Sequence, residues 1–393
     1  MSPSRPRILL ITRNLPPLVG GMERLNWHIA DELSRRSDVH VIGPSESEAL
    51  RPPGVQFTGV PLRPLWRFLQ ASASQAIRVS RSWKPNIVLA GSGLTAPATW
   101  LAAQAASALS CVYLHGLDAA VQHPIYRAIW HPAIRRMHTV IANSQPTAEM
   151  AEALGVNTRQ IQIVHPGVQI PLAPQPASAL HAFRHQHNLG NARILLSIGR
   201  LTSRKGLREF VAHSLPAIVR NAPDTILLVI GDAPTDSLHA SVQSRESIQA
   251  EAEAAGIGQH LRFLSVVTDP DVLACAYECS TLHVFPVRKL PGDPEGFGMV
   301  AIEAAAHGVP TVAFATGGIV DAVAPGQSGH LVPAGDYAAF TKAVLNVLSD
   351  EQNAWLENAC AFSQRFAWPK FGEKLYTSLQ TEHLAPHTGI ARP

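Results

Sequence analysis

The sequence predicts an α/β protein built from two doubly wound domains that face a central cleft. Short apolar runs alternate with longer helix-like segments along the first half, and the alternation begins again in the second half. A proline-rich connector, Ile170–Pro176, separates the halves, and the length of 393 residues suits two domains. Because ligands bind at the carboxyl ends of the strands in such sheets, we expect the active site in the cleft.

The predicted strands are short apolar runs bounded by Gly, Pro or polar residues, as expected of strands buried on both faces of a parallel sheet. In the first half they are Ile8–Ile11, Val39–Ile42, Ile87–Ala90, Cys111–Leu114, Thr139–Ala142 and Ile161–Val164. In the second half they are Ile194–Ile198, Thr225–Ile230, Leu261–Leu264, Leu282–Phe285 and Thr311–Phe314. Helices fit between them, for example Glu246–Ala255 and Ala301–His307.

Charge is unevenly distributed along the chain. The net charge is +3, but residues 1–170 hold 16 Lys and Arg against 9 Asp and Glu, whereas the remainder holds 16 against 20. A basic first half favours an anionic membrane surface or a phosphorylated acceptor, and an ordinary solvated surface is the alternative. The segment Leu62–Trp83 places four arginines among apolar and aromatic side chains, which is typical of a helix lying on a membrane or packed on a sheet. We expect no nucleic-acid partner.

The cysteines and the N-terminus favour a cytoplasmic protein. None of the four cysteines forms a CxxC pair, which fits a reduced compartment. The apolar run Ile8–Thr12 is too short for the hydrophobic region of a signal peptide. Residues 85–117 lack Asp, Glu, Lys and Arg, but Gly, Pro, Ser and Gln interrupt them, so we predict strand, helix and strand rather than a membrane span. Membrane binding would place the protein on the inner face of the plasma membrane.

The most informative segment is Pro294–Pro310, a glycine-rich loop that opens a helix after the strand Leu282–Phe285. Gly296 and Gly298 allow the backbone to approach a ligand closely. The amides at 298–300 would lie at the helix N-terminus, which is a favourable place for a phosphate group.

Two carboxylates, Glu295 and Glu303, bracket the start of that helix. Carboxylates beside a phosphate site are expected to bind hydroxyls, such as those of a sugar or a ribose, and not the phosphates. The alternatives are a capping role for Glu295 and an ordinary surface charge for Glu303. Glu303 lies in an otherwise apolar run, where a charge requires a specific reason.

A second candidate segment, Ser197–Gly206, follows the first strand of the second domain. Arg200 and Lys205 would project from this loop at the strand's carboxyl end. Their positive charges suit a diphosphate that leaves carrying negative charge. The alternative is an ordinary basic surface loop.

Two shorter segments follow strands of the first domain. Gly20 and Gly21 precede an amphipathic helix and allow a close backbone approach, although a Gly-Gly pair alone is weak evidence. A dinucleotide-binding GxGxxG is absent there, which argues against an NAD enzyme. His115 directly follows the strand Cys111–Leu114 and is expected to face the cleft.

Together these segments resemble the retaining glycosyltransferases of family 4, which have the GT-B fold of two Rossmann-like domains. The most specific mark is the E-x7-E motif of Glu295 and Glu303, and the Gly-Arg-Leu…Arg-Lys-Gly loop at 199–206 is nearly as specific. Further matches in the expected order are Gly20–Glu23, His115–Asp118, Ala142–Ser144 and Pro166–Val168. The chain departs from many relatives at Gly231–Pro234 and Phe263–Ser265, near the expected base pocket, which leaves the nucleotide base open.

The resemblance implies a role for each matching residue. Arg200 and Lys205 would hold the donor diphosphate, Glu303 the ribose hydroxyls and Glu295 the donor sugar. Gly20 and Gly21 would close over the phosphate, and His115 would lie beside the reacting centre. The expected catalytic residues are His115, Glu295, Arg200 and Lys205. The expected donor site comprises Gly20, Gly21, Arg200, Lys205, Glu295, Gly296, Phe297, Gly298, Met299, Val300 and Glu303.

The resemblance also implies a domain plan. We expect an N-terminal acceptor-side domain over 1–172 and a C-terminal nucleotide-sugar-binding domain over 177–365. Members of the family typically end with a helix that crosses back onto the first domain, which we place at 366–383. A tail over 384–393 completes the chain.

The implied function is the transfer of a hexose from a GDP- or UDP-linked sugar to a saccharide or lipid-linked acceptor, with retention of configuration. Surface polysaccharide, lipopolysaccharide and glycolipid assembly are the expected settings. We predict a metal-independent reaction with no cofactor. The alternatives are another GT-B enzyme, such as a nucleotide-sugar epimerase, and a non-catalytic nucleotide-sugar-binding protein.

Overall fold

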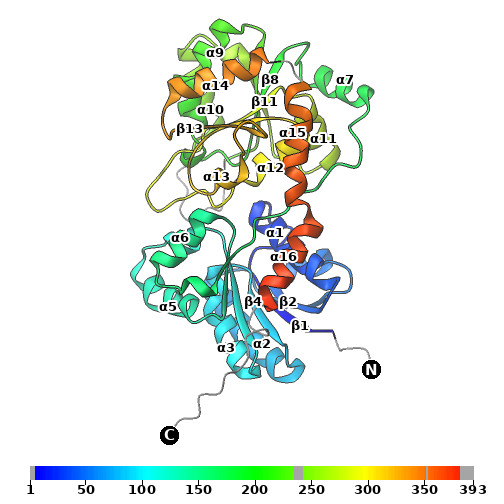
Figure 1. Cartoon of the computed structure of the whole chain (residues 1–393), viewed down its shortest axis with the longest axis vertical. Coiled ribbons are helices and arrows are strands. Elements are labelled where there is room, and N and C mark those ends of the chain that lie inside the picture. The colour runs from blue at the N-terminus through cyan, green and yellow to red at the C-terminus, as the bar shows by residue number, and fades with distance from the viewer. Residues whose placement is uncertain (1–4, 234–241, 351–352, 381–393) are drawn as a thin grey trace. The chain divides into compact units, whose positions relative to one another are not determined.

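The chain folds into two compact units, each built on one parallel sheet (Figure 1). The computed structural model describes residues 5–233, 242–350 and 353–380. The first unit contains the chain up to Gly167 and again from Trp368, and the second unit is Val168–Ala367. The prediction of doubly wound α/β domains is confirmed, because both sheets are wholly parallel and helices connect their strands.

The first unit has a seven-stranded sheet in the order β3-β2-β1-β4-β5-β6-β7. Its strands are β1 (Arg7–Ile11), β2 (Asp38–Pro44), β3 (Gln56–Val60), β4 (Ile87–Ala90), β5 (Leu109–Leu114), β6 (Thr139–Ala142) and β7 (Ile161–Ile163). Its helices are α1 (Gly21–Ser34), α2 (Leu65–Trp83), α3 (Ala96–Ala106), α4 (Leu117–Ala120), α5 (Pro124–Arg135), α6 (Gln145–Ala153) and α16 (Trp368–Gln380). The strand order reverses direction between β1 and β4, where doubly wound sheets bind ligands.

The second unit has a six-stranded sheet in the order β10-β9-β8-β11-β12-β13, which reverses between β8 and β11. Its strands are β8 (Arg193–Ile198), β9 (Thr225–Ile230), β10 (Leu261–Leu264), β11 (Leu282–Phe285), β12 (Thr311–Phe314) and β13 (Gly329–Val332). Its helices are α7 (Ala177–Gln186), α8 (Leu207–His213), α9 (Leu215–Asn221), α10 (Arg245–Ala254), α11 (Pro270–Glu278), α12 (Met299–Ala306), α13 (Ile319–Ala322), α14 (Tyr337–Ser349) and α15 (Asn353–Ser363).

The sequence did not predict β3 and β13, which are both edge strands. In β3 the residue Val60 is buried, while the other four residues are partly or fully exposed. An edge strand of this kind needs no continuous apolar run, so the pattern that identified the central strands is absent. The predicted bounds of β4 and β6, which are buried along their whole length, agree with the structure.

Helix α2 packs its apolar side on the sheet and on α3, the alternative that the sequence had left open for Leu62–Trp83. Phe68 is fully buried, and Leu69 and Trp83 pack against the same core. Trp66, at the start of the helix, remains 60% exposed beside Arg67. Burial of Phe68 removes the continuous apolar face that a membrane-lying helix requires.

The uncharged stretch 85–117 forms a strand, a helix and a strand, as predicted. These elements are β4, α3 and β5. Within the described ranges, the structure has no helix with the length and apolar character needed to span a bilayer.

The connector belongs to the second unit, which differs from the predicted domain boundary at 172–177. The Val168 N–H donates to the Phe366 carbonyl at 2.7 Å, and Val168 is buried in the core of that unit. The Gln175 N–H donates to Glu278 of α11 at 2.7 Å. These contacts tie residues 168–176 to the second unit before the first predicted helix begins.

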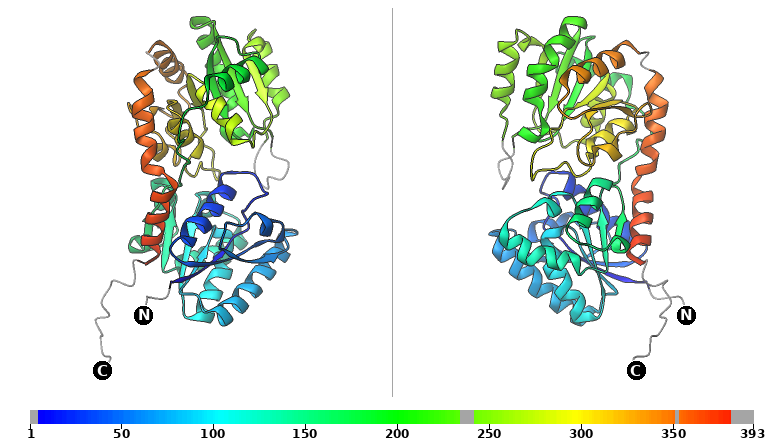
Figure 2. Two further views of the ribbon diagram at one scale, coloured as in Figure 1. Left: turned by 90° about the vertical axis from the view of Figure 1, so that its right-hand side faces the viewer. Right: turned by 60° about the vertical axis from the view of Figure 1, so that its left-hand side comes forward.

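Helix α16, which corresponds to the helix expected at 366–383, lies against α1 of the first unit (Figure 2). Trp368 stacks on His28 of α1 with their ring centroids 3.7 Å apart. Gly372 meets Glu32, because a Cβ built on Gly372 would lie 2.6 Å from the Glu32 side chain. The predicted tail at 384–393 lies outside the described residues.

Candidate active site

Two loops meet at the switch point of the second sheet. The loop 199–206 follows β8 and the loop 286–298 follows β11, the two strands between which the order reverses. The Arg288 N–H donates to the Arg204 carbonyl at 2.8 Å. Gly206, which has a φ of +69°, allows the close approach, since a Cβ there would lie 2.9 Å from Arg288 Cγ.

These loops bring Lys205 and Glu295, ninety residues apart in the sequence, into direct contact. Lys205 Nζ lies 2.8 Å from Glu295 Oε2, and the Arg204 guanidinium bonds to the same oxygen. Arg204 Nε also lies 3.1 Å from a carboxylate oxygen of Asp293. The side chains of Lys205 and Glu295 are only 18% and 12% exposed, so the pair is largely shielded from water.

The charges of this cluster control one another. Burial alone would raise the pKa of Glu295, but Lys205 and Arg204 outweigh burial and bring that pKa down to about 2. Burial lowers the pKa of Lys205 below its usual value, although Glu295 acts in the opposite direction. A second anion beside Lys205 would favour its charged form, so the site is electrostatically suited to accept one.

Two residues of β11 near Lys205, Phe285 and His283, add no positive charge to the cluster. Lys205 Nζ lies 4.7 Å from the centroid of the Phe285 ring on β11. His283, on the same strand, is fully buried, and burial together with Lys205 lowers its pKa to about 3. Its imidazole is therefore neutral near pH 7.

Sequence reasoning missed Arg204 and Asp293. The motif 199–206 directed attention to Arg200 and Lys205, whereas the structure places Arg204 on Glu295 and leaves Arg200 exposed. Arg200 still contributes to the low pKa of Glu295 through its charge. The position of Arg204 directly before Lys205 was the available signal for a role in the site. No neighbouring residue in the sequence identified Glu295 as its partner.

The glycine-rich loop leads into α12 as predicted. Gly298 is the N-cap of α12, has a φ of +92° and forms no side-chain capping bond. A Cβ on Gly298 would lie 2.9 Å from the Phe285 ring, so only glycine fits there without rearrangement. Phe297 is buried in the core under the helix, whereas Gly296, Met299 and Val300 are partly exposed.

Glu303 has a specific partner in an otherwise apolar helix. The Tyr277 hydroxyl donates to Glu303 Oε2 at 3.1 Å. Tyr277 is 1% exposed and stacks on His307, and the Nδ1 atom of His307 lies 3.0 Å from Glu278. Glu303 itself is half-buried. This hydrogen bond orients the carboxylate.

The loop after β12 supports the backbone of Glu295. The Gly318 N–H donates to the Glu295 carbonyl at 2.9 Å. A Cβ on Gly317 would lie 3.2 Å from the Glu295 carbonyl carbon, and one on Gly318 would lie 2.6 Å from that of Gly296. The position of Glu295 therefore depends on two glycines in the loop that follows β12.

The remaining predicted residues, His115, Gly20 and Gly21, follow strands of the first unit at the carboxyl edge of its sheet. His115 Nε2 lies 2.8 Å from the Gly91 carbonyl. Because a carbonyl only accepts, Nε2 carries the proton in this contact. His115 is 8% exposed, and its own N–H donates to Asp118 at 3.0 Å, so backbone and ring are both held.

Gly20 is the N-cap of α1. A Cβ on Gly20 would collide with the carboxylate of Glu23, which accepts a hydrogen bond from Asn14 at 2.7 Å. Gly21 is the first residue of the helix and is exposed. Because neither glycine has a side chain, neither can cover the N-terminal end of α1.

Two family models match the chain. The one described as Glycosyltransferase Family 4 matches residues 19–170, and the one described as Glycosyl transferases group 1 matches residues 181–362. Together they account for most of both units. The chain belongs to glycosyltransferase family 4.

Comparisons with individual proteins agree with this family. The chain is similar to a GDP-mannose-dependent alpha-(1-6)-phosphatidylinositol monomannoside mannosyltransferase from Mycolicibacterium smegmatis, with 30% identity over 53% of this chain and 52% of the relative. That match spans about half the length of the mannosyltransferase. A glycogen synthase from Mycobacterium tuberculosis is 26% identical over 98% of this chain and 96% of the relative.

The solved structures support the fold. The Anabaena protein Alr3699/HepE, solved in complex with UDP, matches with a TM-score of 0.77 and 20% identity over 95% of this chain and all of that chain. Likeness at this identity shows the fold alone. The chain therefore has the GT-B fold.

Proposed function

We propose that this family 4 member is a retaining glycosyltransferase that moves a hexose from a GDP- or UDP-linked donor to an acceptor hydroxyl. The observation that carries the proposal is the meeting of Lys205, Arg204 and Glu295 at the switch point of the second sheet. A cation pair and an ionised carboxylate, placed beside a helix N-terminus, suit a ligand that has both phosphates and hydroxyls.

The donor would lie along the second unit in a defined order. Lys205 has three N–H donors and uses one on Glu295, so it can also bind a phosphate oxygen. Arg200 and the amides of Gly298, Met299 and Val300 would bind the rest of the diphosphate. Glu303 would accept from the ribose hydroxyls and Glu295 from the donor sugar. Gly20, Gly21 and His115 would contribute the remaining residues of the proposed site.

The chemical task is to stabilise the departing diphosphate. The bond from the anomeric carbon to the diphosphate breaks as the acceptor oxygen approaches on the same face, so that the configuration is retained. Positive groups already in place for the growing negative charge stabilise this transition state more than the ground state. Lys205 and Arg200 supply those charges in the proposal. We propose that no metal ion is required.

A thermal-shift screen with UDP, GDP, ADP and their sugar conjugates, run with and without EDTA, tests the donor site. One nucleotide is expected to raise the melting temperature, because a ligand at 100 times its Kd stabilises by about 2.7 kcal/mol. Glu303→Ala and Arg200→Ala should lose the shift, whereas Arg220→Ala, which removes an exposed arginine of α9, should keep it. A shift that disappears in EDTA would contradict metal independence.

Turnover separates this proposal from its alternatives. Release of the nucleoside diphosphate with formation of an α-linked product from an α-linked donor supports retaining transfer. Interconversion of nucleotide sugars without an acceptor would instead support an epimerase. Binding without turnover would support a non-catalytic protein, and absence of any nucleotide-induced shift would contradict a donor site.

We further propose that the acceptor is membrane-associated, as in glycolipid, lipopolysaccharide or surface polysaccharide assembly. Between Glu48 and Glu149 the sequence has one carboxylate side chain, Asp118, against nine Lys and Arg. The same stretch of sequence exposes three large apolar side chains: Trp66 by 60%, Ile125 by 59% and Ile129 by 50%. Basic residues combined with exposed apolar ones favour the surface of an anionic bilayer.

Sedimentation with vesicles tests this surface. The protein is expected to pellet with vesicles that contain anionic phospholipid and to remain in solution with zwitterionic ones. Replacing Trp66 and Ile125 by serine should reduce pelleting, whereas Ile163→Ser, a change to another partly exposed residue of the unit, should not. No pelleting with anionic vesicles would contradict membrane binding, and equal pelleting of the double variant would contradict the role of these residues.

A further inference from the structure

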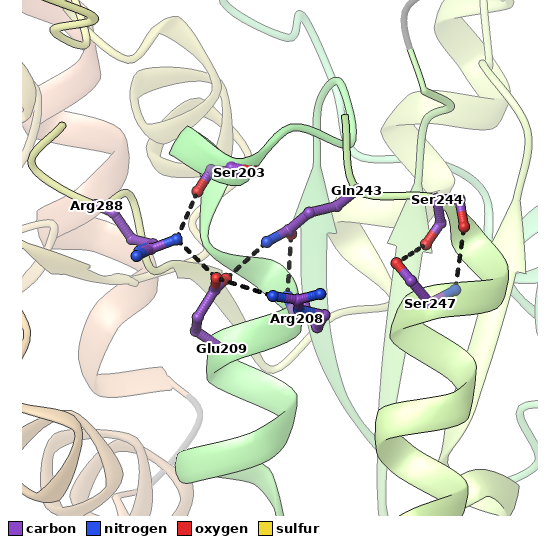
Figure 3. Close-up of polar contacts among 7 residues, drawn as sticks. All are labelled: Ser203, Arg208, Glu209, Gln243, Ser244, Ser247 and Arg288. Atoms are coloured by element: carbon purple, nitrogen blue, oxygen red, sulfur yellow. Dashed lines mark hydrogen bonds and ion pairs between the residues drawn. The ribbon is translucent and has the colours of Figure 1, made fainter. Parts of the chain in front are cut away.

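Glu209, in the first turn of α8, connects this helix with the chain segments that contain Gln243 and Arg288 (Figure 3). Its Oε1 atom accepts from Arg288 at 2.7 Å, and its Oε2 atom accepts from Gln243 at 2.7 Å. The Glu209 side chain is 16% exposed. No motif in the sequence singled out this residue.

Both partners of Glu209 are attached to the 201–206 segment through their own backbones. The Arg288 N–H donates to the Arg204 carbonyl at 2.8 Å. The Gln243 N–H donates to the Leu201 carbonyl at 3.1 Å, and its neighbour Val242 pairs with Thr202. Glu209 therefore bonds to two chain segments, one at Gln243 and one at Arg288, that are each hydrogen-bonded to residues 201–206.

Residues 201–206, to which both segments attach, include two basic residues of the candidate site, Arg204 and Lys205. Arg204 and Lys205 both reach Glu295, and the backbone of Arg204 is the point at which Arg288 attaches. Among the residues that the structure describes, Glu209 forms no hydrogen bond or ion pair with Glu295 or Lys205. The bonds to Arg288 and Gln243 are the contacts that link the Glu209 side chain to this segment.

We propose that Glu209 is a positioning residue that holds the 201–206 loop, and thereby Arg204 and Lys205, in place for the donor diphosphate. The inference rests on the proposed function and extends it to a residue that touches neither donor nor acceptor. A carboxylate in the first turn of a helix also interacts favourably with the helix dipole. That interaction accounts for an acidic residue at this position but not for its two bonds to separate loops.

Loss of the charge should loosen both attachments together. In Glu209→Gln the side chain keeps its size but holds one acceptor oxygen and a new N–H₂ donor, which faces the donors of Arg288 or Gln243. A buried donor that lacks an acceptor costs free energy, so the segments at Gln243 and Arg288 are expected to move. Arg204 and Lys205 would then lose their fixed position, although their own charges are unchanged.

The first experiment measures amide hydrogen exchange in the ligand-free protein. Glu209→Gln is expected to accelerate exchange by about tenfold or more in peptides that cover 201–206 and 286–288, while the first unit is unchanged. Glu357→Gln is the matched control, since it removes an exposed carboxylate of α15 in the same unit. Unchanged exchange around 201–206 would overturn the inference whether or not the protein binds a nucleotide.

The second experiment asks whether the loop position matters for binding. At a temperature well below the melting transition, Glu209→Gln should weaken the Kd of the nucleoside diphosphate by about tenfold, the equivalent of one charge-assisted hydrogen bond. The acceptor KM should stay unchanged, and Glu209→Asp should restore part of the affinity. An unchanged Kd, with or without a lower melting temperature, would overturn the positioning role.

A milder variant covers the case in which Glu209→Gln does not fold. Gln243→Leu removes the side-chain bonds of Gln243 to Glu209 and to the Arg208 N–H and leaves the Glu209–Arg288 pair intact, so exchange should rise in 201–206 more than in 286–288. Equal exchange in wild type and Gln243→Leu would overturn the inference. Failure of the wild type itself to bind any nucleotide would count against the proposed function, independently of the exchange result.

Discussion

Lys205→Ala is expected to lower kcat by about 10²- to 10³-fold, the cost of removing one preorganised charge that stabilises a developing anion. Lys205 is largely buried, lies 2.8 Å from Glu295 and is surrounded by the ring of Phe285 and a neutral His283. Water screens a largely buried charge less than an exposed one, so the loss should exceed that of an exposed lysine. The affinity for the nucleoside diphosphate should fall as well.

The matched control for this prediction is Lys289→Ala, which removes an exposed lysine from the neighbouring loop. Its effect on kcat should stay within about twofold, since exposed charges contribute little. Steady-state kinetics with saturating donor and acceptor provide the measurement, and near-ultraviolet circular dichroism checks the fold. A kcat for Lys205→Ala close to that of wild type would remove Lys205 from the proposed catalytic residues.

Gly318→Ala is expected to destabilise the second unit by about 3 kcal/mol, the upper range for overpacking a tight site. The new Cβ would lie 2.6 Å from the Gly296 carbonyl carbon and 2.7 Å from Phe297 Cα. Both atoms belong to the backbone, so no flexible side chain can move aside. For a unit of this size, a loss of that magnitude lowers the melting temperature by about 6–12 °C.

The same substitution should also abolish donor binding, because the Gly318 N–H holds the Glu295 carbonyl. Gly326→Ala is the control: its φ is +76°, but a Cβ there meets nothing within 4 Å. It should cost about 1 kcal/mol, the usual penalty for a left-handed alanine, and leave nucleotide binding intact. Equal melting temperatures for the two variants would show that the loop around Gly318 rearranges freely.

Much of the fold was predictable because its central strands are buried on both faces. β4 and β6 consist of short apolar runs between residues that interrupt regular structure. Such a run by itself indicates a strand that is buried on both faces. The edge strand β3 was missed because a strand with one neighbour can hold polar residues. The boundary of the second unit was misplaced because Val168 is anchored by Phe366, nearly two hundred residues away.

The sequence by itself determined the two α/β units and the local motifs, including the glycine-rich turn into α12 and the basic loop with Arg200 and Lys205. These features follow from hydrophobic periodicity and from glycine's freedom of φ, which are properties of neighbouring residues. Only the tertiary structure decided that Arg204 joins Lys205 on Glu295, that Tyr277 orients Glu303 and that Glu209 connects Gln243 with Arg288. The contacts of Arg204 and Lys205 with Glu295 join the loops that follow β8 and β11, so they depend on the adjacency of these two strands in the sheet, which no local pattern encodes.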